Sequence, residues 1–339
     1  MDRIKKYCEA NNLHHILNTD IKSFIGIANN NIQPPTEEEI ANAKEIWVDA
    51  SYDPIMVEKD PWLSILTDIK KVNPRVKALT CDFTYWYKTD PEIIYCPYWF
   101  MTVYPLYNFK PKNTRRFKFS CLNRELKPHR LMNFCLFMES EYLADSCISF
   151  WGRAMYANLT EEEHRANLYR MLKKCNDSEL NNIFAKVEHL IPYKPYEPEY
   201  AGENDHGMSH LAYTDTYINL VTETSCDFID LYVHCDAPIL TEKTIKPLMC
   251  RQMFLMCAQT GAVQFMRDLG FDMFDDVIDH SYDKVEGFVP KTYAIHQELQ
   301  RLSKLDLAKI FEQNSNRLEH NYLRLFRPEF KSLITKQMK

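Results

Sequence analysis

The segment APILTEKTIKPLM, residues 237–249, places a threonine, a glutamate and two lysines at the expected start of a helix. Thr241 is a suitable N-cap residue. Lys243 and Lys246 follow it, and lysines at a helix N-terminus oppose the helix dipole unless an anion compensates them. Two interpretations stay open. The segment is an ordinary capped helix start, or Glu242 accepts hydrogen bonds from ribose hydroxyls while Lys243 reaches a phosphate.

A second group of candidate residues is basic. Residues 110–130 contain eight lysines or arginines and a single acid, Glu125. Within this segment, residues 127–130 are expected to begin a helix directly after a strand, where free backbone N–H groups favour an anion. Arg130 is placed to hold a diphosphate. The alternative is that the basic stretch is only a solvated face.

Polar residues also follow several other expected strands. In open α/β sheets, ligands bind at the carboxyl ends of the strands, so these positions are candidate site residues. Asp49 and Asp82 are read either as loop caps or as a general base that takes a proton from an acceptor hydroxyl. The remaining candidates at strand ends are Asn123, Arg124, Lys127, His129, Thr222, Glu223 and Thr224.

The order of elements predicts an α/β protein. Short apolar runs rich in β-forming residues alternate with segments of helical period, which is typical of parallel sheets. Strands are expected at 45–51, 76–83, 92–100, 116–123, from 147, and at 217–224. Helices are expected from Asp60, at 130–143, at 160–175 with Thr160 as N-cap, at 243–256 and at 292–326.

Length and composition limit the possible functions. A chain of 339 residues exceeds the size at which a single core stops growing, so two domains are expected. The net charge of -6 gives no general attraction to nucleic acid or to an anionic membrane. Eleven cysteines without a Cys-x-x-Cys pair predict neither a zinc site nor a disulfide framework. We expect a reduced cytoplasmic protein without a membrane span.

Familiar cofactor motifs are missing. Only seven glycines occur, and none forms a Gly-x-Gly-x-x-Gly or a Walker arrangement. His-Glu-x-x-His, Gly-x-Ser-x-Gly and Asp-x-Asp are absent as well. The sequence therefore predicts chemistry that needs no bound metal.

Three stretches carry a resemblance to a known family. FSCLNRELKPHRLMNFCLF resembles the strand, loop and helix that open the donor domain of certain glycosyltransferases of phages and large DNA viruses. YINLVTET, followed by the segment from ILTEKTIKPLM to DHSYD, resembles the donor-binding half of the same proteins. Thr-Glu-Lys at a helix start is similar to the donor motif of fucosyltransferases. Together with NRLEHN at 316–321, the resemblance spans roughly residues 115–325.

The resemblance implies the GT-B fold, in which two Rossmann-like domains face a cleft. Residues 1–110 would form the acceptor-side domain, residues 111–300 the donor domain, and residues 301–339 a C-terminal helix that packs back toward the N-terminal domain. A hexosyl or pentosyl transfer from a UDP- or GDP-linked sugar is expected, without a metal. Residue by residue, Arg130 would bind the diphosphate, Glu242 the ribose, and Lys243 a phosphate or the leaving group, with Glu223, Thr224 and Thr241 nearby.

The acceptor is less constrained than the donor. The phage relatives imply hydroxymethylated cytosine in DNA, with residues 110–130 contacting phosphates. The net charge of -6 favours a glycan or protein acceptor instead. If the protein is viral, the cytoplasm is that of the host cell. A non-catalytic nucleotide-binding module and a structural protein without a ligand are the alternatives from other classes.

Overall fold

The structure is a computed structural model of the chain. It describes strands and short segments of the first hundred residues and most of the rest up to Leu325. The described residues are 16–18, 23–26, 38, 41, 46–50, 70–74, 76–80, 93–95, 112, 114–153, 160–195, 210–224, 226–227, 238 and 240–325. Two compact units divide the chain: unit 1 comprises Met1–Thr102, Ile229–Ile239 and Pro328–Lys339, and unit 2 comprises Val103–Phe228 and Leu240–Arg327.

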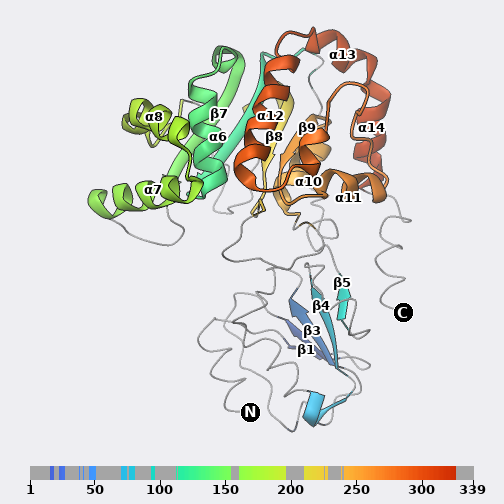
Figure 1. The fold of residues 1–339 in the computed structure, drawn as a ribbon. Helices are drawn as coiled ribbons and strands as arrows, with labels where there is room; N and C mark the ends of the chain where they lie inside the picture. Colours follow the sequence, from blue (N-terminus) through green and yellow to red (C-terminus); the bar gives the residue numbers. More distant parts are fainter. Residues whose placement is uncertain are drawn as a thin grey trace. The chain divides into compact units, whose positions relative to one another are not determined.

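Unit 1 contains a five-stranded sheet in the order β1-β2-β3-β4-β5 (Figure 1). The strands are β1 (Ile16–Asn18), β2 (Ser23–Gly26), β3 (Ile46–Ala50), β4 (Val76–Thr80) and β5 (Ile93–Tyr95). β1 and β2 are antiparallel, and the other neighbours are parallel. The three strands predicted at 45–51, 76–83 and 92–100 are thus confirmed in shorter form. β1 and β2 were not predicted, because runs of three or four residues carry little periodicity.

Unit 2 contains a four-stranded parallel sheet in the order β7-β6-β8-β9. The strands are β6 (Phe117–Glu125), β7 (Ser146–Arg153), β8 (Thr216–Thr222) and β9 (Met253–Cys257). Every residue of β8 and β9 is buried. Parallel strands covered on both faces read as continuous apolar runs, and these two strands fit that pattern. The described chain is therefore an α/β protein, as predicted.

Helices cover both faces of this sheet. The crossover from β6 to β7 contains α6 (Pro128–Met138), and the crossover from β8 to β9 contains α10 (Glu242–Met249). The two crossovers run in opposite directions along the sheet, and right-handed connections then place α6 and α10 on opposite faces. α12 (Phe288–Leu302) contacts α6 and β9, while α9 (His210–Thr214) and α13 (Leu307–Gln313) contact β8.

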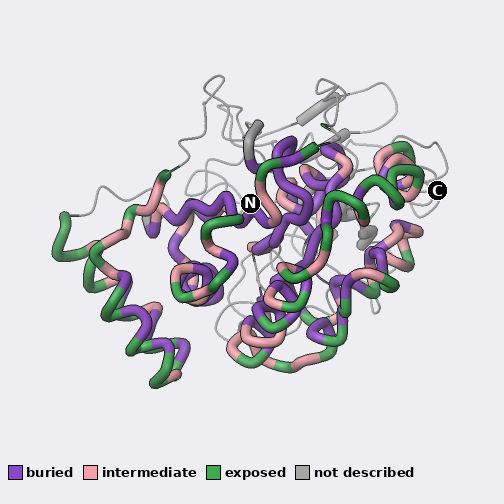
Figure 2. The backbone as a smooth tube through the Cα atoms, turned by 90° about the horizontal axis from the view of Figure 1, so that it is seen from above, coloured by how far each residue is buried: buried purple, intermediate pink, exposed green. Residues whose placement is uncertain are grey.

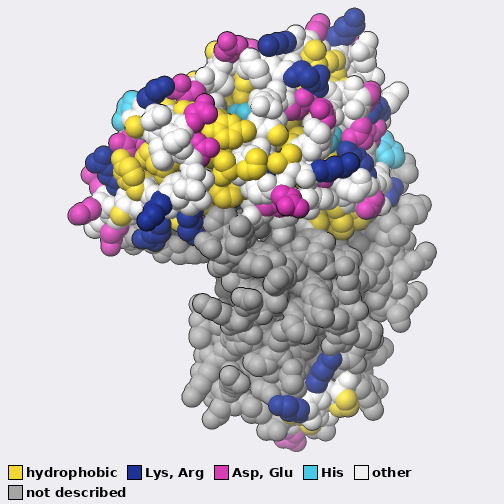
Figure 3. Space-filling view, viewed as in Figure 1, with side chains coloured by type: hydrophobic (Ala, Val, Ile, Leu, Met, Phe, Trp, Pro, Cys, Tyr) yellow, Lys and Arg dark blue, Asp and Glu magenta, His cyan; other side chains and the backbone are white. Residues whose placement is uncertain are grey.

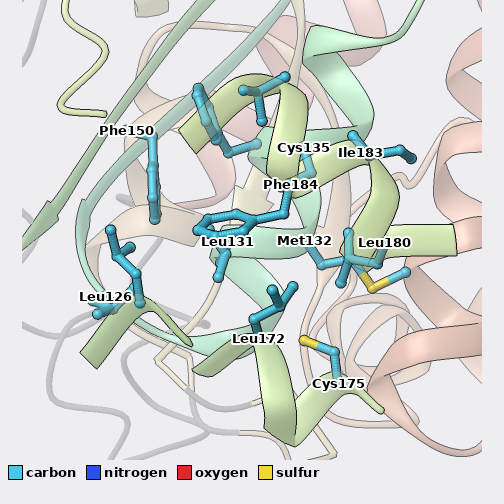
Figure 4. Close-up of a cluster of buried hydrophobic side chains, with 13 residues drawn as sticks. Leu126, Leu131, Met132, Cys135, Phe150, Leu172, Cys175, Leu180, Ile183 and Phe184 are labelled. Carbon is cyan, nitrogen blue, oxygen red and sulfur yellow. The ribbon is translucent and has the colours of Figure 1, made fainter. Parts of the chain in front are cut away.

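A helical hairpin extends the core beyond α6. α7 (Glu161–Cys175) and α8 (Ser178–Val187) both contact α6. Thr160 caps α7 in a full capping box with Glu163, which confirms the predicted N-cap. Phe134 of α6 stacks on Phe150 of β7 with ring centroids 5.0 Å apart. Figure 4 shows Phe150 together with the labelled buried side chains of α6, α7 and α8. Figure 2 shows that the exposed residues lie on the outer faces of the helices and the buried residues on the inner faces.

Three predicted helices differ from the structure. The helix predicted over 130–143 is α6, which begins at Pro128 and ends at Met138. The helix predicted over 243–256 is wrong in its second half, because α10 ends at Met249 and β9 begins at Met253. Pro247 lacks a backbone N–H, and Arg251 takes a left-handed φ of 52° that ends the helix. The following run MFLMC consists of buried residues and forms the edge strand.

The single helix predicted over 292–326 is also wrong. It is divided into α12, α13 and α14 (Ser315–Arg324), and residues beyond Leu325 lie outside the described part. Asp306 caps α13 by accepting from the Lys309 backbone N–H, which marks a new helix start. The predicted packing of residues 301–339 against the N-terminal domain stays a prediction. The remaining short elements are η1 (Leu143–Asp145), η2 (Glu188–Leu190), α11 (Ala262–Asp268) and η3 (Ser281–Lys284).

Candidate functional site

The sheet of unit 2 has one topological switch point. From β6 the chain moves to β7 on one side, and from β8 it moves to β9 on the other, although β6 and β8 are neighbours. The connections after these two strands diverge, and open α/β sheets bind ligands at such a point, outside the carboxyl ends of the strands. The segments at this position are the β6–α6 turn, the residues after β8, and the start of α10.

The β6–α6 turn contributes two cations and an acid. Pro128 occupies the first turn of α6, where the backbone N–H groups have no partner within the helix, so proline loses no helical hydrogen bond. Arg130 is almost fully buried, and its guanidinium lies 3.4 Å from Glu125 Oε2. It also donates to the backbone carbonyls of Thr222 (3.3 Å) and Glu223 (3.2 Å). Arg130 therefore ties the β6–α6 turn to the end of β8.

The carboxylate of Glu223 organises the start of α10. Glu223 is fully buried, and its Oε1 accepts from the Thr241 backbone N–H (2.9 Å) and from Thr244 Oγ1 (2.5 Å). Its Oε2 accepts from Thr241 Oγ1 (2.6 Å) and the Thr224 backbone N–H (3.2 Å). A negative charge at a helix N-terminus is favourable. Part of the compensation that the lysines of α10 require is thus supplied by the protein itself.

Two lysines from different segments meet at Thr224. Lys127 Nζ donates to the Thr224 carbonyl (2.8 Å), and Lys243 Nζ donates to the Thr224 hydroxyl (3.4 Å). Lys243 also contacts Thr241 Oγ1 (3.1 Å) and Glu242 Oε1 (3.2 Å). We call the whole set the switch-point cluster. It consists of Glu125, Lys127, Arg130, Glu223, Thr224, Thr241, Glu242 and Lys243.

The pKa shifts follow from burial and from charge crowding. Burial, with Arg130 close by, lowers the pKa of Lys127 to about 8. Burial also lowers the pKa of Arg130. Burial alone would raise the pKa of Glu242, but Lys243 and Lys246 bring it down to about 2. An incoming anion would therefore stabilise the protonated forms of Lys127 and Arg130.

By its residue type, His129 was expected to be structural or solvent-facing rather than catalytic. This residue is buried, and its Nε2 lies 3.0 Å from the Glu223 carbonyl, so Nε2 carries the proton that it donates. Burial, with Arg130 and Lys127 nearby, holds its pKa well below the usual value. Among the described residues, His129 Nδ1 and Arg130 Nε are buried without a hydrogen-bond partner. Two polar atoms at one turn thus have unused hydrogen-bonding capacity.

Four other predicted site residues are not members of the switch-point cluster. Asn123 is buried and pairs with the Thr222 hydroxyl across the strands. Arg124 is exposed, with its guanidinium 5.7 Å from the Trp151 ring centroid. The backbone of Asp49 lies inside β3, opposite Gly26 and Leu79. Asp82 lies outside the described residues, so its role stays a prediction.

The basic segment of residues 110–130 is divided between the two ends of β6. Arg116 and Lys112 pair with Asp215 (2.6 Å and 3.3 Å) before the strand, and Lys118 pairs with Asp145 (2.9 Å). Arg115 is buried against backbone carbonyls at the same end. A nine-residue strand is roughly 30 Å long. The basic residues therefore do not form the single phosphate-contacting strip that the sequence predicted.

The low pKa of Lys127 predicts a pH-dependent affinity. A bound anion favours the protonated amine, so binding should weaken as the pH rises through about 8. If the cluster binds a nucleoside diphosphate, as the sequence predicts, its dissociation constant should increase about tenfold between pH 7 and pH 9. Lys127→Arg keeps its charge over this range and should remove most of the dependence. Titration calorimetry at pH 7 and pH 9 measures the two dissociation constants. If the dissociation constant of Lys127→Arg depended on pH as steeply as that of the wild type, a group other than Lys127 would cause the pH dependence.

Comparisons with protein-family models, with curated proteins and with solved structures find no match for this chain. The geometry of the switch-point cluster is therefore the observation from which a function can be proposed. Among the described residues, no group of three or more His, Cys, Asp or Glu side chains is arranged to hold a metal ion. No helix in the described part is long and apolar enough to cross a membrane.

Proposed function

We propose that this protein is a glycosyltransferase that moves a sugar from a UDP- or GDP-linked donor to an acceptor hydroxyl. The observation that carries the proposal is the convergence of Lys127, Arg130 and Lys243 at the switch point of the unit 2 sheet. The N-termini of α6 and α10 begin beside these cations. Such an arrangement suits a diphosphate. In this proposal the two units are the Rossmann-like halves of a GT-B enzyme.

The cluster would act mainly on the leaving group. Glycosyl transfer passes through a transition state with positive charge on the sugar and increasing negative charge on the departing oxygen. Preorganised cations and backbone N–H groups stabilise that negative charge. Lys243 has an exposed fraction of 27%, which makes its ammonium the most accessible of the three cations. Lys243 would contact the diphosphate, and Glu242, held ionised beside it, would accept from the ribose hydroxyls.

The sequence offers two candidates for the proton acceptor. If the reaction inverts the configuration at the sugar, Asp49 or Asp82 takes the proton of the acceptor hydroxyl. If it retains the configuration, neither residue needs that role. The side chains of both residues are outside the description of the structure, so this assignment comes from the sequence alone.

The acceptor is more consistent with a glycan or a protein than with DNA. The division of residues 112–130 removes the continuous basic strip, and lysines and arginines alternate with acids on the described part of the face in Figure 3. A DNA acceptor, including one with hydroxymethylated cytosine, predicts salt-dependent retention on a DNA column. No retention at low salt would exclude it. Strong retention that falls steeply with salt would restore it.

Turnover distinguishes an enzyme from a non-catalytic nucleotide-binding module. The protein is incubated with UDP- and GDP-linked hexoses and pentoses, with and without glycan or protein acceptors, and free UDP or GDP is measured. An enzyme should release nucleoside diphosphate many times over per protein molecule. Tight binding of a nucleotide sugar without release under any acceptor condition would support the module instead.

A further inference from the structure

Two cysteines lie in contact beside the switch-point cluster. Cys226 lies four residues beyond the end of β8, and Cys257 is the last residue of the neighbouring strand β9. Their Sγ atoms are 3.5 Å apart, and both side chains are fully buried. A disulfide has an S–S distance of about 2.0 Å, so closure requires an approach of about 1.5 Å. The two sulfurs are placed to bond after a small movement.

The surroundings of Cys257 favour its thiolate. Its Sγ accepts a hydrogen bond from Asn133 Nδ2 at 3.4 Å and lies 3.8 Å from Thr292 Oγ1. The hydrogen bond between the two thiols lowers the pKa of Cys257 and raises that of Cys226, with the Lys291 ammonium also stabilising the Cys257 thiolate. Thiolates rather than thiols react with oxidants.

The other described cysteines differ in this respect. Cys121, Cys135, Cys147, Cys175 and Cys250 are buried, and burial raises the pKa of each one. Among the cysteines that the structure describes, reactivity toward an oxidant is therefore expected to concentrate on the pair of Cys226 and Cys257.

The same two residues are connected to the cluster through the backbone. The Cys257 carbonyl accepts from the Glu223 backbone N–H at 3.0 Å. Cys226 follows Thr224, where Lys127 and Lys243 meet, by two residues. A bond between the sulfurs would draw this short segment toward β9. The positions of the two ammonium groups would then change relative to α10.

We propose that Cys226 and Cys257 form a reversible disulfide that weakens anion binding at the switch-point cluster. Hydrogen peroxide is the oxidant: the Cys257 thiolate attacks one oxygen, giving a sulfenic acid and, after protonation of hydroxide, water. The Cys226 sulfur then attacks the sulfenic sulfur, forming the S–S bond and releasing a second water. In total, two thiols and one peroxide give one disulfide and two waters. A dithiol reductant reverses the reaction by exchange.

Peptide mapping tests the disulfide without any ligand. The full chain is treated with hydrogen peroxide, its remaining thiols are blocked by alkylation, and it is digested without reduction. A cross-linked peptide pair containing Cys226 and Cys257 is expected, and dithiothreitol should abolish it. Because both sulfurs are buried, the reaction should require local opening and take place slowly. Cys226→Ser and Cys257→Ser should each prevent the cross-link, whereas Cys147→Ser, a buried cysteine elsewhere in the sheet, should not.

Binding of UDP and GDP tests the regulatory part, which is based on the proposed function. The oxidised protein should bind at least about tenfold more weakly than the reduced protein, and dithiothreitol should restore the affinity. A missing cross-link, or a cross-link with unchanged affinity, would overturn the proposal. If the reduced protein binds neither UDP nor GDP, the proposed function and its regulation both fail, while the peptide map still decides whether the disulfide forms.

Discussion

Glu223→Ala is expected to lower the free energy of unfolding by about 3–4 kcal/mol. The substitution removes the acceptor for the Thr241 backbone N–H and for the hydroxyls of Thr241 and Thr244, all of them buried. Each buried donor left without a partner costs about 1–3 kcal/mol, and relaxation of the helix start recovers part of this. The loss can be measured by urea-induced unfolding, followed by tryptophan fluorescence.

Two matched variants show whether the effect comes from the hydrogen bonds. Glu223→Gln keeps the size and one acceptor oxygen, so its loss should be smaller than that of the alanine variant. Glu139→Ala removes an exposed carboxylate whose nearest cation is Lys186 at 3.3 Å, and it should change stability by less than about 0.5 kcal/mol. If Glu223→Ala proved as stable as Glu139→Ala, the carboxylate would not be the anchor of α10.

Lys243→Met is expected to lower kcat/KM for the nucleotide sugar about 100-fold. The side chain of Lys243 is partly exposed, and its ammonium is held beside Thr224 and Thr241 at the switch point. Removing one preorganised charge that stabilises a leaving group costs on the order of 10²–10³ in rate. The methionine chain preserves the packing of the lysine stem, so the unfolding transition should stay close to that of the wild type.

Lys118→Met provides the control for net charge. Lys118 lies at the opposite end of β6 and pairs with Asp145 at 2.9 Å. This variant changes the total charge by the same amount and should retain kcat/KM within about twofold. Equal losses in both variants would indicate a general electrostatic effect. Full activity of Lys243→Met in a correctly folded protein would contradict the proposed donor site.

Local sequence patterns predicted much of unit 2. The apolar runs gave β6, β7 and β8, and Thr160 with its glutamate at the third helical position gave the start of α7. The helix predicted over 243–256 was wrong because buried runs such as MFLMC lack a period of two and resemble a helix continuation. Arg251 with its left-handed φ ends α10, and this conformation is not visible in the residue type.

The sequence selected several residues that the structure brings together, but it did not predict which of them contact one another. The rule that ligands bind at strand ends selected Arg130, Glu223 and Lys243, and the structure brings all three together. The sequence assigned the compensation of the α10 lysines to a ligand. The structure shows that Glu223, which precedes Thr241 by 18 residues in the sequence, supplies part of this compensation. Such long-range pairing is set by the strand order, which single-sequence patterns do not contain.

Titration calorimetry of UDP and GDP against the wild type and Lys243→Met tests the central claim most directly. The switch-point cluster should bind one diphosphate per chain, with affinity lost about tenfold or more in Lys243→Met and retained in Lys118→Met. The same affinity in all three proteins would place the diphosphate elsewhere. No heat of binding and no thermal stabilisation with either nucleotide would contradict the claim that this cluster is a donor site.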